Sequence, residues 1–275
     1  MLRKVKNLIT RFEALIWAKR RYKFLVSNLT NVEDLTKARD LISSLVYTNH
    51  IRPLSAMVPK NRKILVIAPH PDDEIIGPGG FLLMARKRHC EISIFYLSSG
   101  QVDQFEIREA ESRALCQEAG WTPFFGRNTA GKHPWKADNL TEIINKLQPD
   151  ILMLPFVLDD NPDHRHANEV LYNSWKATRM ALKTSEVYAY QVYSAIIPNV
   201  VVDISTVIRE KATYIRFHKS QMKTRDWVHF TLGLNAWTSR WLKTDGNEAW
   251  AEGFMVMPCH EYISLISHYC GKDST

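Results

Sequence analysis

An imidazole and three carboxylates stand close together directly after the apolar run 64–68, at His70, Asp72, Asp73 and Glu74. The run is typical of a buried parallel strand, and the glycines that follow the acidic residues are typical of a helix start. Open α/β sheets bind their ligands at the carboxyl ends of strands. Adjacent carboxylates repel one another and resist desolvation, and His and Asp are ordinary zinc ligands, so the loop is a candidate metal site. The alternative is a solvated acidic turn.

A second polar loop, residues 159–166 (DDNPDHRH), also follows an apolar strand-like run, residues 151–156. Because both loops lie at the carboxyl ends of predicted strands, they can face one crevice. His164 taken alone would more often be a surface or helix-capping histidine. The pairing with the first loop favours a shared site instead.

The sequence APHPDDE with its glycine-rich helix start, and the later PDH, resemble the motifs of the PIG-L/LmbE family of metal-dependent N-acetylglucosaminyl deacetylases. The resemblance covers about residues 63–260. It implies that His70, Asp73 and His164 hold zinc and that Asp72 is the general base. Three such ligands leave positions open for water and substrate, as in catalytic zinc sites. Two histidines and one carboxylate also suit non-haem iron, so another divalent metal such as Fe2+ is an alternative.

The second motif departs from the family pattern at Asn161, where relatives carry the first histidine of HPDH. In relatives that histidine stabilises the oxyanion or protonates the leaving amine. Asn161 can donate a hydrogen bond to an oxyanion but cannot give up a proton. We therefore expect His166, or Asp72 after it has taken a proton from water, to act as the acid; the alternative for His166 is a plain helix-surface residue. Asp163 is expected to orient Asp72 or a ligating histidine, to cap the following helix, or to do both.

The resemblance also implies three substrate-binding residues. Arg108, in IREAESRALCQEAGW, would bind an anionic or sugar part of the substrate, or else pair with Glu111 three residues later. Asn128 stands where relatives offer an Asp to sugar hydroxyls. His218, in KATYIRFHKSQ, would approach the site, or else be a satisfied core histidine.

The main rival for the first loop is dinucleotide binding, which also uses a strand, a glycine-rich turn and a helix. The fingerprint G-x-G-x-x-G fails, because Leu82 occupies the third glycine position after Gly77 and Gly79. The acid that would bind a ribose at the end of the next strand is also missing. These departures argue against a nicotinamide enzyme or a methyltransferase, and the absence of G-x-S-x-G argues against a serine hydrolase.

Net positive charge is confined to one end of the 275-residue chain. Residues 1–25 hold eight basic residues and one acid, whereas the remainder holds 28 basic and 28 acidic residues. The body therefore has no net electrostatic attraction for nucleic acid. Apolar residues in 1–25 recur at three- and four-residue steps, which predicts an amphipathic helix with a basic face. That helix either lies on a membrane surface or packs on the domain.

The four cysteines, at positions 90, 116, 259 and 270, form no CxxC pair. This spacing argues against a zinc finger, and with no signal peptide it favours a reduced cytoplasmic setting over a disulfide framework. No apolar run approaches the length needed to span a bilayer. We therefore expect a cytoplasmic protein, with peripheral membrane contact through residues 1–25 as an added hypothesis.

From residue 63 onward, predicted strands and helices alternate, which favours a parallel sheet with right-handed crossovers. The fold class we predict is α/β: a Rossmann-like parallel sheet flanked by helices, with an N-terminal helical segment and a C-terminal α+β extension. The domain division is 1–60, comprising helices at 1–25 and 31–46 and a linker, and 61–275, the deacetylase-like domain. Predicted strands are 63–68, 91–97, 121–125 and 150–155, predicted helices are 77–88, 105–119, 138–147 and 165–181, and the extension holds strand-like runs VYAYQVY, NVVVDI and FMVMP, a helix at 204–223, a Trp-rich region at 226–250 and a terminal helix.

Taken with the resemblance, these features predict a metal-dependent hydrolase that removes an N-acetyl group from an amino sugar or its conjugate. The expected partner is the N-acetylated amino sugar, and the expected cofactor is Zn2+ or another divalent metal. Two alternatives come from other functional classes: a non-catalytic sugar-binding relative, and a membrane-surface partner protein.

Overall fold

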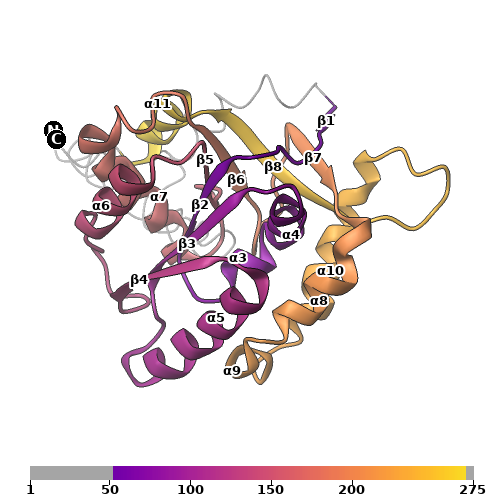
Figure 1. Cartoon of the computed structure of the whole chain (residues 1–275), viewed down its shortest axis with the longest axis horizontal. Helices are drawn as coiled ribbons and strands as arrows, with labels where there is room; N and C mark the ends of the chain where they lie inside the picture. The colour runs from indigo at the N-terminus through magenta and orange to yellow at the C-terminus, as the bar shows by residue number, and fades with distance from the viewer. Residues whose placement is uncertain (1–51, 271–275) are drawn as a thin grey trace, which may run out of the picture.

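The computed structural model of the chain describes residues 52–270 (Figure 1). One eight-stranded sheet runs through these residues in the order β1-β7-β8-β6-β5-β2-β3-β4. Neighbouring strands in it are parallel, except that β8 runs antiparallel to both β6 and β7. The strands are β1 Leu54–Ser55, β2 Lys63–Ala68, β3 Glu91–Ser98, β4 Thr122–Asn128, β5 Ile151–Pro155, β6 Glu186–Tyr190, β7 Val200–Asp203 and β8 Ala251–Pro258.

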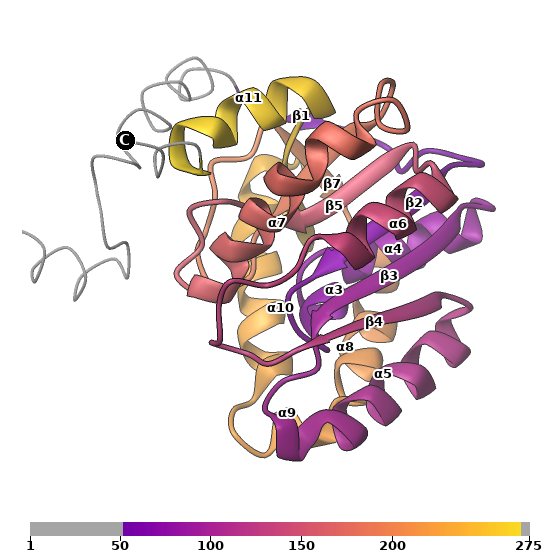
Figure 2. The same ribbon diagram turned by 90° about the vertical axis from the view of Figure 1, so that its left-hand side faces the viewer.

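Helices cover both faces of this sheet (Figures 1 and 2). Successive side chains of a strand point to opposite faces, so Val66 of β2 belongs to the core cluster that includes residues of α4, α5, α8 and α10, whereas Leu65 belongs to the cluster that includes residues of α6, α7 and α11. Burial on both faces explains why β2 and β5 are almost wholly apolar. The helices are α3 Asp73–Ile76, α4 Gly79–Lys87, α5 Phe105–Ala119, α6 Asp138–Leu147, α7 Pro162–Thr178, α8 Ile208–Ile215, α9 Lys219–Met222, α10 Trp227–Thr238 and α11 Cys259–Cys270.

Helix α4 begins at two glycines because other elements lie against its first turn. A Cβ atom on Gly80 would lie 2.7 Å from Cγ2 of Ile204. The N–H groups of Gly80 and Phe81 donate to the two carboxylate oxygens of Glu252, at 2.6 and 2.7 Å. The Nζ atom of Lys211 lies 2.7 Å from Oε1 of the same carboxylate. These contacts tie the helix that follows the first polar loop to β8 and α8.

The predicted α/β class with a parallel central sheet is confirmed, and α5 and α6 have the predicted bounds. The structure adds one antiparallel strand, β8, and places β1 inside the segment predicted as a linker. The single helix predicted at 204–223 is wrong. The chain breaks between α8 and α9, where the side chain of His218 turns inward to Glu74, with Nε2 and Oε1 3.0 Å apart.

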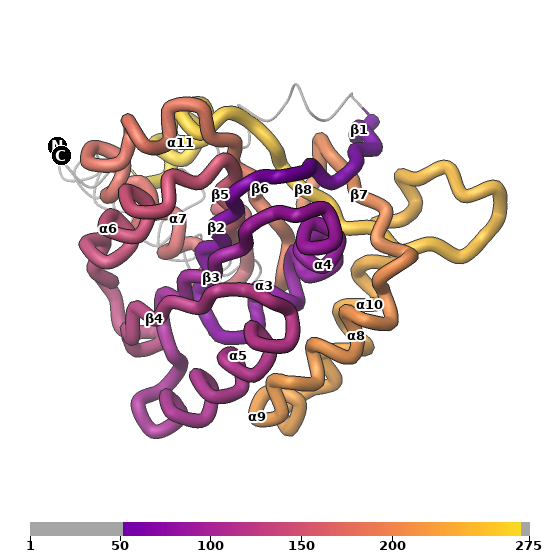
Figure 3. Tube along the Cα trace, in the orientation of Figure 1, coloured from indigo at the N-terminus to yellow at the C-terminus, as the bar shows by residue number. Residues whose placement is uncertain are grey.

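Three further differences concern helices. The helix predicted at 165–181 is α7, which spans Pro162–Thr178. The helix predicted at 77–88 begins at Gly79, after a separate turn α3, and α10 in the Trp-rich region was not predicted. The tube in Figure 3 shows the segment between α10 and β8 extending away from the body of the molecule. The helices predicted at 1–25 and 31–46 lie outside the described residues, and the domain division stays a prediction. Within 52–270, no helix is both long and apolar enough to cross a membrane.

Candidate active site

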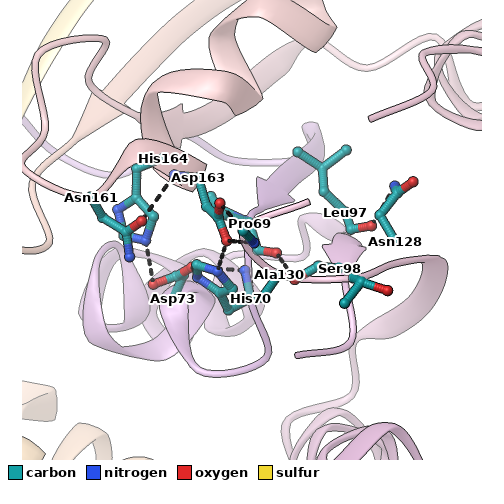
Figure 4. A network of polar contacts seen from close by, with 12 residues as sticks. Pro69, His70, Asp73, Leu97, Ser98, Asn128, Ala130, Asn161, Asp163 and His164 are labelled. Carbon is teal, nitrogen blue, oxygen red and sulfur yellow. Dashed lines mark hydrogen bonds and ion pairs between the residues drawn. The ribbon is translucent and has the colours of Figure 1, made fainter. Parts of the chain in front are cut away.

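The loop between β2 and α3 is fixed by its neighbour strand and by its own backbone (Figure 4). The N–H and hydroxyl groups of Ser98, at the end of β3, both donate to the carbonyl oxygen of Pro69, at 3.0 and 2.9 Å. The N–H of His70 donates to Oδ2 of Asp73 at 2.8 Å. The imidazole and the carboxylate therefore leave this loop in fixed relative positions.

The side chains of His70, Asp73 and His164 converge from the two polar loops. One potential ligand atom from each of the three lies within 4.8 Å of the other two. The first two residues follow β2, and His164 lies in the first turn of α7, which follows β5. Because β2 and β5 are adjacent parallel strands, their carboxyl ends bring these residues together.

Buried nitrogen atoms in this group lack hydrogen bonds. His164 is fully buried, with Nε2 3.3 Å from Oδ1 of Asp73 and Nδ1 3.1 Å from Oδ1 of Asp159, but neither contact has hydrogen-bond geometry. A buried polar atom without a hydrogen bond is costly. Two ring nitrogens and a carboxylate oxygen that converge in this way are a suitable donor set for a divalent cation.

The electrostatics of the group favour added positive charge. Burial lowers the pKa of His164, but Asp73 and Asp159 outweigh it and raise the pKa to about 10. Burial likewise opposes ionisation of Asp73, yet His164 and His70 hold its pKa well below the usual range. Protons on the histidines thus balance the carboxylates, and a metal ion would take over that task by displacing them.

Asp163 connects the site to a third loop, the one between β4 and α6. Its Oδ2 lies 2.8 Å from Nε2 of His70 and accepts from the N–H of Gly131 at 3.0 Å. Its Oδ1 lies 2.7 Å from Nε2 of His133. A carboxylate on the outer nitrogen of a ligating histidine fixes the orientation and tautomer of the ring. The N-cap of α7 is Asn161, so the structure does not use Asp163 as the cap.

We call His70, Asp73 and His164 the metal group. Asp72 lies beside the metal group and has a strained backbone conformation. Its φ of 125° lies in the region that non-glycine residues rarely adopt, which is costly and concentrates at functional sites. Its Oδ2 is 3.4 Å from Nη2 of Arg108, which also donates to the carbonyl oxygen of Pro71 at 2.6 Å. Burial raises the pKa of Asp72 to about 6, although Arg108 lowers it.

The three predicted substrate-binding residues already have partners in the protein. Arg108 holds the Asp72 loop, as just described, and contacts that loop instead of Glu111, whose carboxylate accepts from Ser220. The side-chain amide of Asn128 donates to the carbonyl oxygen of Leu97 at 2.7 Å. His218 is 1% exposed and faces Glu74. In this arrangement all three residues make contacts that hold the loops, and substrate binding by them stays a prediction.

The candidate oxyanion donor, Asn161, and the candidate acid of the second loop, His166, are also engaged. The side-chain oxygen of Asn161 accepts from the N–H of Asp163 at 2.9 Å and caps α7. The Nε2 atom of His166 accepts from the backbone N–H of Trp135 at 2.9 Å, and its Nδ1 lies 2.6 Å from Oε2 of Glu169. An Nε2 that accepts a hydrogen bond has no proton to give.

The sequence pattern assigned no role to Glu74, although it lies in the first loop, and gave no indication of His133. Glu74 is fully buried, pairs with His218 and accepts from the N–H of Asp72 at 2.9 Å. The position of Glu74 in the acidic motif could have indicated its role, because an acid that is buried there needs a partner. His133 lies between β4 and α6 and belongs to no motif, so no local signal pointed to it.

Residues 65–175 match the model of the PIG-L family, described as GlcNAc-PI de-N-acetylase. The matched span starts in β2 and ends in α7, so it contains both polar loops. These residues form a PIG-L domain. The family resemblance drawn from HPDDE and PDH is confirmed, and all three residues of the metal group lie inside the PIG-L domain.

Known proteins resemble the chain well beyond the PIG-L domain. Diacetylchitobiose deacetylase from Thermococcus kodakarensis is 25% identical over 236 residues, covering 76% of this chain and 86% of that protein. The N,N'-diacetylchitobiose deacetylase structure from Pyrococcus horikoshii has a TM-score of 0.61 and 22% identity, covering 82% of this chain and 94% of the other. The 4-carboxy-2-hydroxymuconate hydratase GalB from Pseudomonas putida has a TM-score of 0.58 and 18% identity, covering 71% and 96%. One fold thus occurs in a deacetylase and a hydratase, so the reaction must be argued from the site.

Proposed function

We propose that the protein removes the N-acetyl group from an acetylated amino sugar by metal-dependent hydrolysis. The observation that carries the proposal is the convergence of His70, Asp73 and His164 beside the buried carboxylate of Asp72. Its place inside a PIG-L domain favours an N-acetyl group as the target. The Thermococcus and Pyrococcus proteins are named for deacetylation of diacetylchitobiose, which favours an amino sugar.

The metal is held, in this proposal, by His70, Asp73 and His164. Support comes from the hydrogen-bond-free nitrogens of His164 and from the protons that the site needs to balance its carboxylates. A divalent cation would supply Lewis-acid activation of water and of the amide carbonyl. We expect zinc, with Fe2+ as the alternative for the same donor set.

Asp72 takes the proton from the attacking water. An aspartate with a pKa of about 6 is ionised at neutral pH and is a stronger base than an exposed one. Arg108 on the carboxylate and Glu74 on the backbone N–H hold it in its left-handed conformation. Their contribution is to keep the base oriented before substrate arrives.

The remaining residues support this geometry. Asp163 orients the ring of His70 through Nε2. Asn161 uses its oxygen as the helix cap, which leaves its NH2 group as a donor for the developing oxyanion. His218 and Asn128 act indirectly, since one holds Glu74 and the other holds the end of β3.

The proposal is tested by acetate release from N-acetylglucosamine and N,N'-diacetylchitobiose. Purified full-length protein is stripped with a chelator and then reloaded with Zn2+ or Fe2+, with metal content measured in each sample. We expect release to depend on the metal and to be lost in His164→Ala. His229→Ala, an exposed histidine on α10, is the matched control and should behave like wild type.

Failure of both metals to support release would remove the enzymatic proposal. Binding of the same sugars without release would then favour the non-catalytic sugar-binding alternative. A calorimetric titration of the metal-loaded protein with each sugar separates that case from a protein that ignores both sugars.

We also propose that residues 1–25 bind anionic membranes. The proposal is supported by the sequence alone, because residues 1–25 combine eight basic residues and one acid with an apolar stripe. Each basic residue near an anionic membrane surface contributes about 1 kcal/mol to the binding free energy. Flotation with anionic vesicles should require residues 1–25 and weaken with salt. Equal flotation of the truncated protein would contradict the proposal.

A further inference from the structure

Hydrolysis of an amide needs a proton donor as well as a base. The amine that leaves is a poor leaving group until its nitrogen is protonated, and a positioned acid contributes about 10²–10⁴-fold to such steps. The two residues of the second polar loop do not meet this need. Asn161 has no acidic proton, and Nε2 of His166 accepts a hydrogen bond from Trp135.

Another imidazole lies beside them. The ring of His133 stacks on that of His166, with centroids 4.1 Å apart and planes 22° apart. Its Nε2 lies 2.7 Å from Oδ1 of Asp163, the carboxylate whose other oxygen contacts His70. The loop carrying His133 is anchored at the same carboxylate through the N–H of Gly131.

The second ring nitrogen of His133 is available. Within residues 52–270 its Nδ1 has neither a hydrogen-bond partner nor an ion-pair partner, and the side chain is 29% exposed. By contrast, His218 is 1% exposed and faces Glu74. Of these two histidines, His133 therefore combines a fixing carboxylate, a partner-free nitrogen and access to solvent.

We infer that His133 is the acid that protonates the leaving nitrogen, held by Asp163 and replacing the histidine that is missing at Asn161. The inference rests on the deacetylase function proposed above. In the tetrahedral adduct the carbon–nitrogen bond breaks and its electron pair stays on nitrogen, which takes the proton from Nδ1 of His133. As this bond breaks, the oxyanion re-forms the carbonyl, so the products are the free amine and acetic acid, which loses its proton to solvent as acetate. Neutral His133 regains a proton from solvent at its exposed edge, and the water proton on Asp72 is released to solvent.

The surroundings of His133 suit this task. Burial and the neighbouring His166 lower its pKa, whereas Asp163 and Glu169 act to raise it. A lowered pKa makes the imidazolium a stronger acid, while Asp163 keeps a negative charge beside it. Asp163 thus serves two histidines, one in the metal group and one at the leaving group.

Two variants test the inference. His133→Gln keeps a hydrogen-bond donor at this position without an acidic proton, and His133→Ala opens space that free imidazole can enter. With N-acetylglucosamine and N,N'-diacetylchitobiose as probes, we expect kcat to fall about 10²-fold in both, while KM and bound metal stay at wild-type values. Added imidazole should restore part of kcat in His133→Ala and none in His133→Gln. His229→Ala is the control that should match wild type throughout.

Several outcomes overturn the inference. Wild-type kcat in His133→Gln would make His133 a positioning residue for Asp163, and wild-type kcat in both variants would leave the acid role to Asp72. Loss of metal in both variants, or no response of His133→Ala to imidazole, would make the role structural. If wild type itself releases no acetate with either metal, the proposed function fails and the inference fails with it.

Discussion

Two clusters of buried charge lie close to the same loop but balance their charges differently. In the lysine cluster, Nζ of Lys211 contacts Oε1 of Glu252 at 2.7 Å, Oδ1 of Asn235 at 3.1 Å, and the carbonyl oxygens of Ile76 and Gly77 at 2.9 and 3.2 Å. Glu252 also accepts two backbone N–H groups of α4. In the histidine cluster, formed by His70, Asp73, Asp163 and His164, the nitrogens of His164 make no hydrogen bond.

The contrast separates a structural ion pair from a binding site. Burial lowers the pKa of Lys211 even though Glu252 acts to raise it, so a perturbed pKa alone would have marked both clusters. In the lysine cluster, the positive charge of Lys211 is paired with Glu252, and the remaining contacts of its ammonium group are filled by oxygen atoms of the protein. In the histidine cluster, the negative charge of the carboxylates is balanced only when the histidines carry protons or a cation binds. This unbalanced charge indicates a binding site.

The largest expected effect comes from opening the histidine cluster. His164→Ala removes one of the three proposed metal donors, so the folded protein should lose bound metal and the several kcal/mol of transition-state stabilisation that a metal would supply. Metal analysis and circular dichroism of the same sample check this. Full metal occupancy in the variant would mean that His164 is not a ligand.

The lysine cluster should fail in a different way. Lys211→Met leaves Glu252 buried without its cation, and we expect the free energy of unfolding to fall by about 3–5 kcal/mol in a urea titration. The matched control is Lys87→Met, which breaks an exposed pair of the same 2.7 Å length and should cost about 1 kcal/mol or less. Equal losses in the two variants would contradict the assignment of Lys211 as a buried structural partner.

Asp72→Asn tests the base beside the metal group. Asparagine keeps the size and an oxygen that can face Arg108 but cannot take a proton, so kcat should fall by about 10²-fold with metal content unchanged. Steady-state kinetics and metal analysis are the two measurements. Joint loss of metal and activity would instead place Asp72 among the ligands.

The smallest effect is expected at the carboxylate that orients His70. Asp163→Asn keeps an acceptor oxygen but removes the charge behind the ligating ring, so metal affinity should fall by about 10- to 100-fold. Competition with a chelator of known affinity measures the change. An unchanged affinity would show that the charge of Asp163 does not act on the metal through His70.

The sequence predicted the parts of this site that depend on local pattern. An apolar run followed by acids and glycines predicted β2 and its loop, and parallel neighbours explain why His164 meets His70. The fold class followed from the alternation of predicted strands and helices, and the predicted bounds of α5 and α6 are those observed. Metal ligation itself stays a prediction.

Contacts between distant segments could not be predicted. His166 was a candidate acid until Trp135, 31 residues earlier, was found donating to it. His133 lies beside Asp163 because of the path of the loop before α6, which the sequence does not show. Helix α10 was missed because its sequence, WVHFTLGLNAWT, contains a glycine and β-branched residues, and its buried face contacts β8 and α8.

The position of β8 has a consequence for the order of synthesis. This strand follows both β6 and β7 in the chain, yet it lies between them and carries Glu252 to the start of α4. Both polar loops are therefore translated long before the strand that anchors α4. Until residue 258 has left the ribosome, the edge of β6 has no partner on that side, and an open strand edge invites pairing with other chains. The nascent chain thus depends on β8 both to join β6 to β7 in the sheet and to complete the support of the first polar loop.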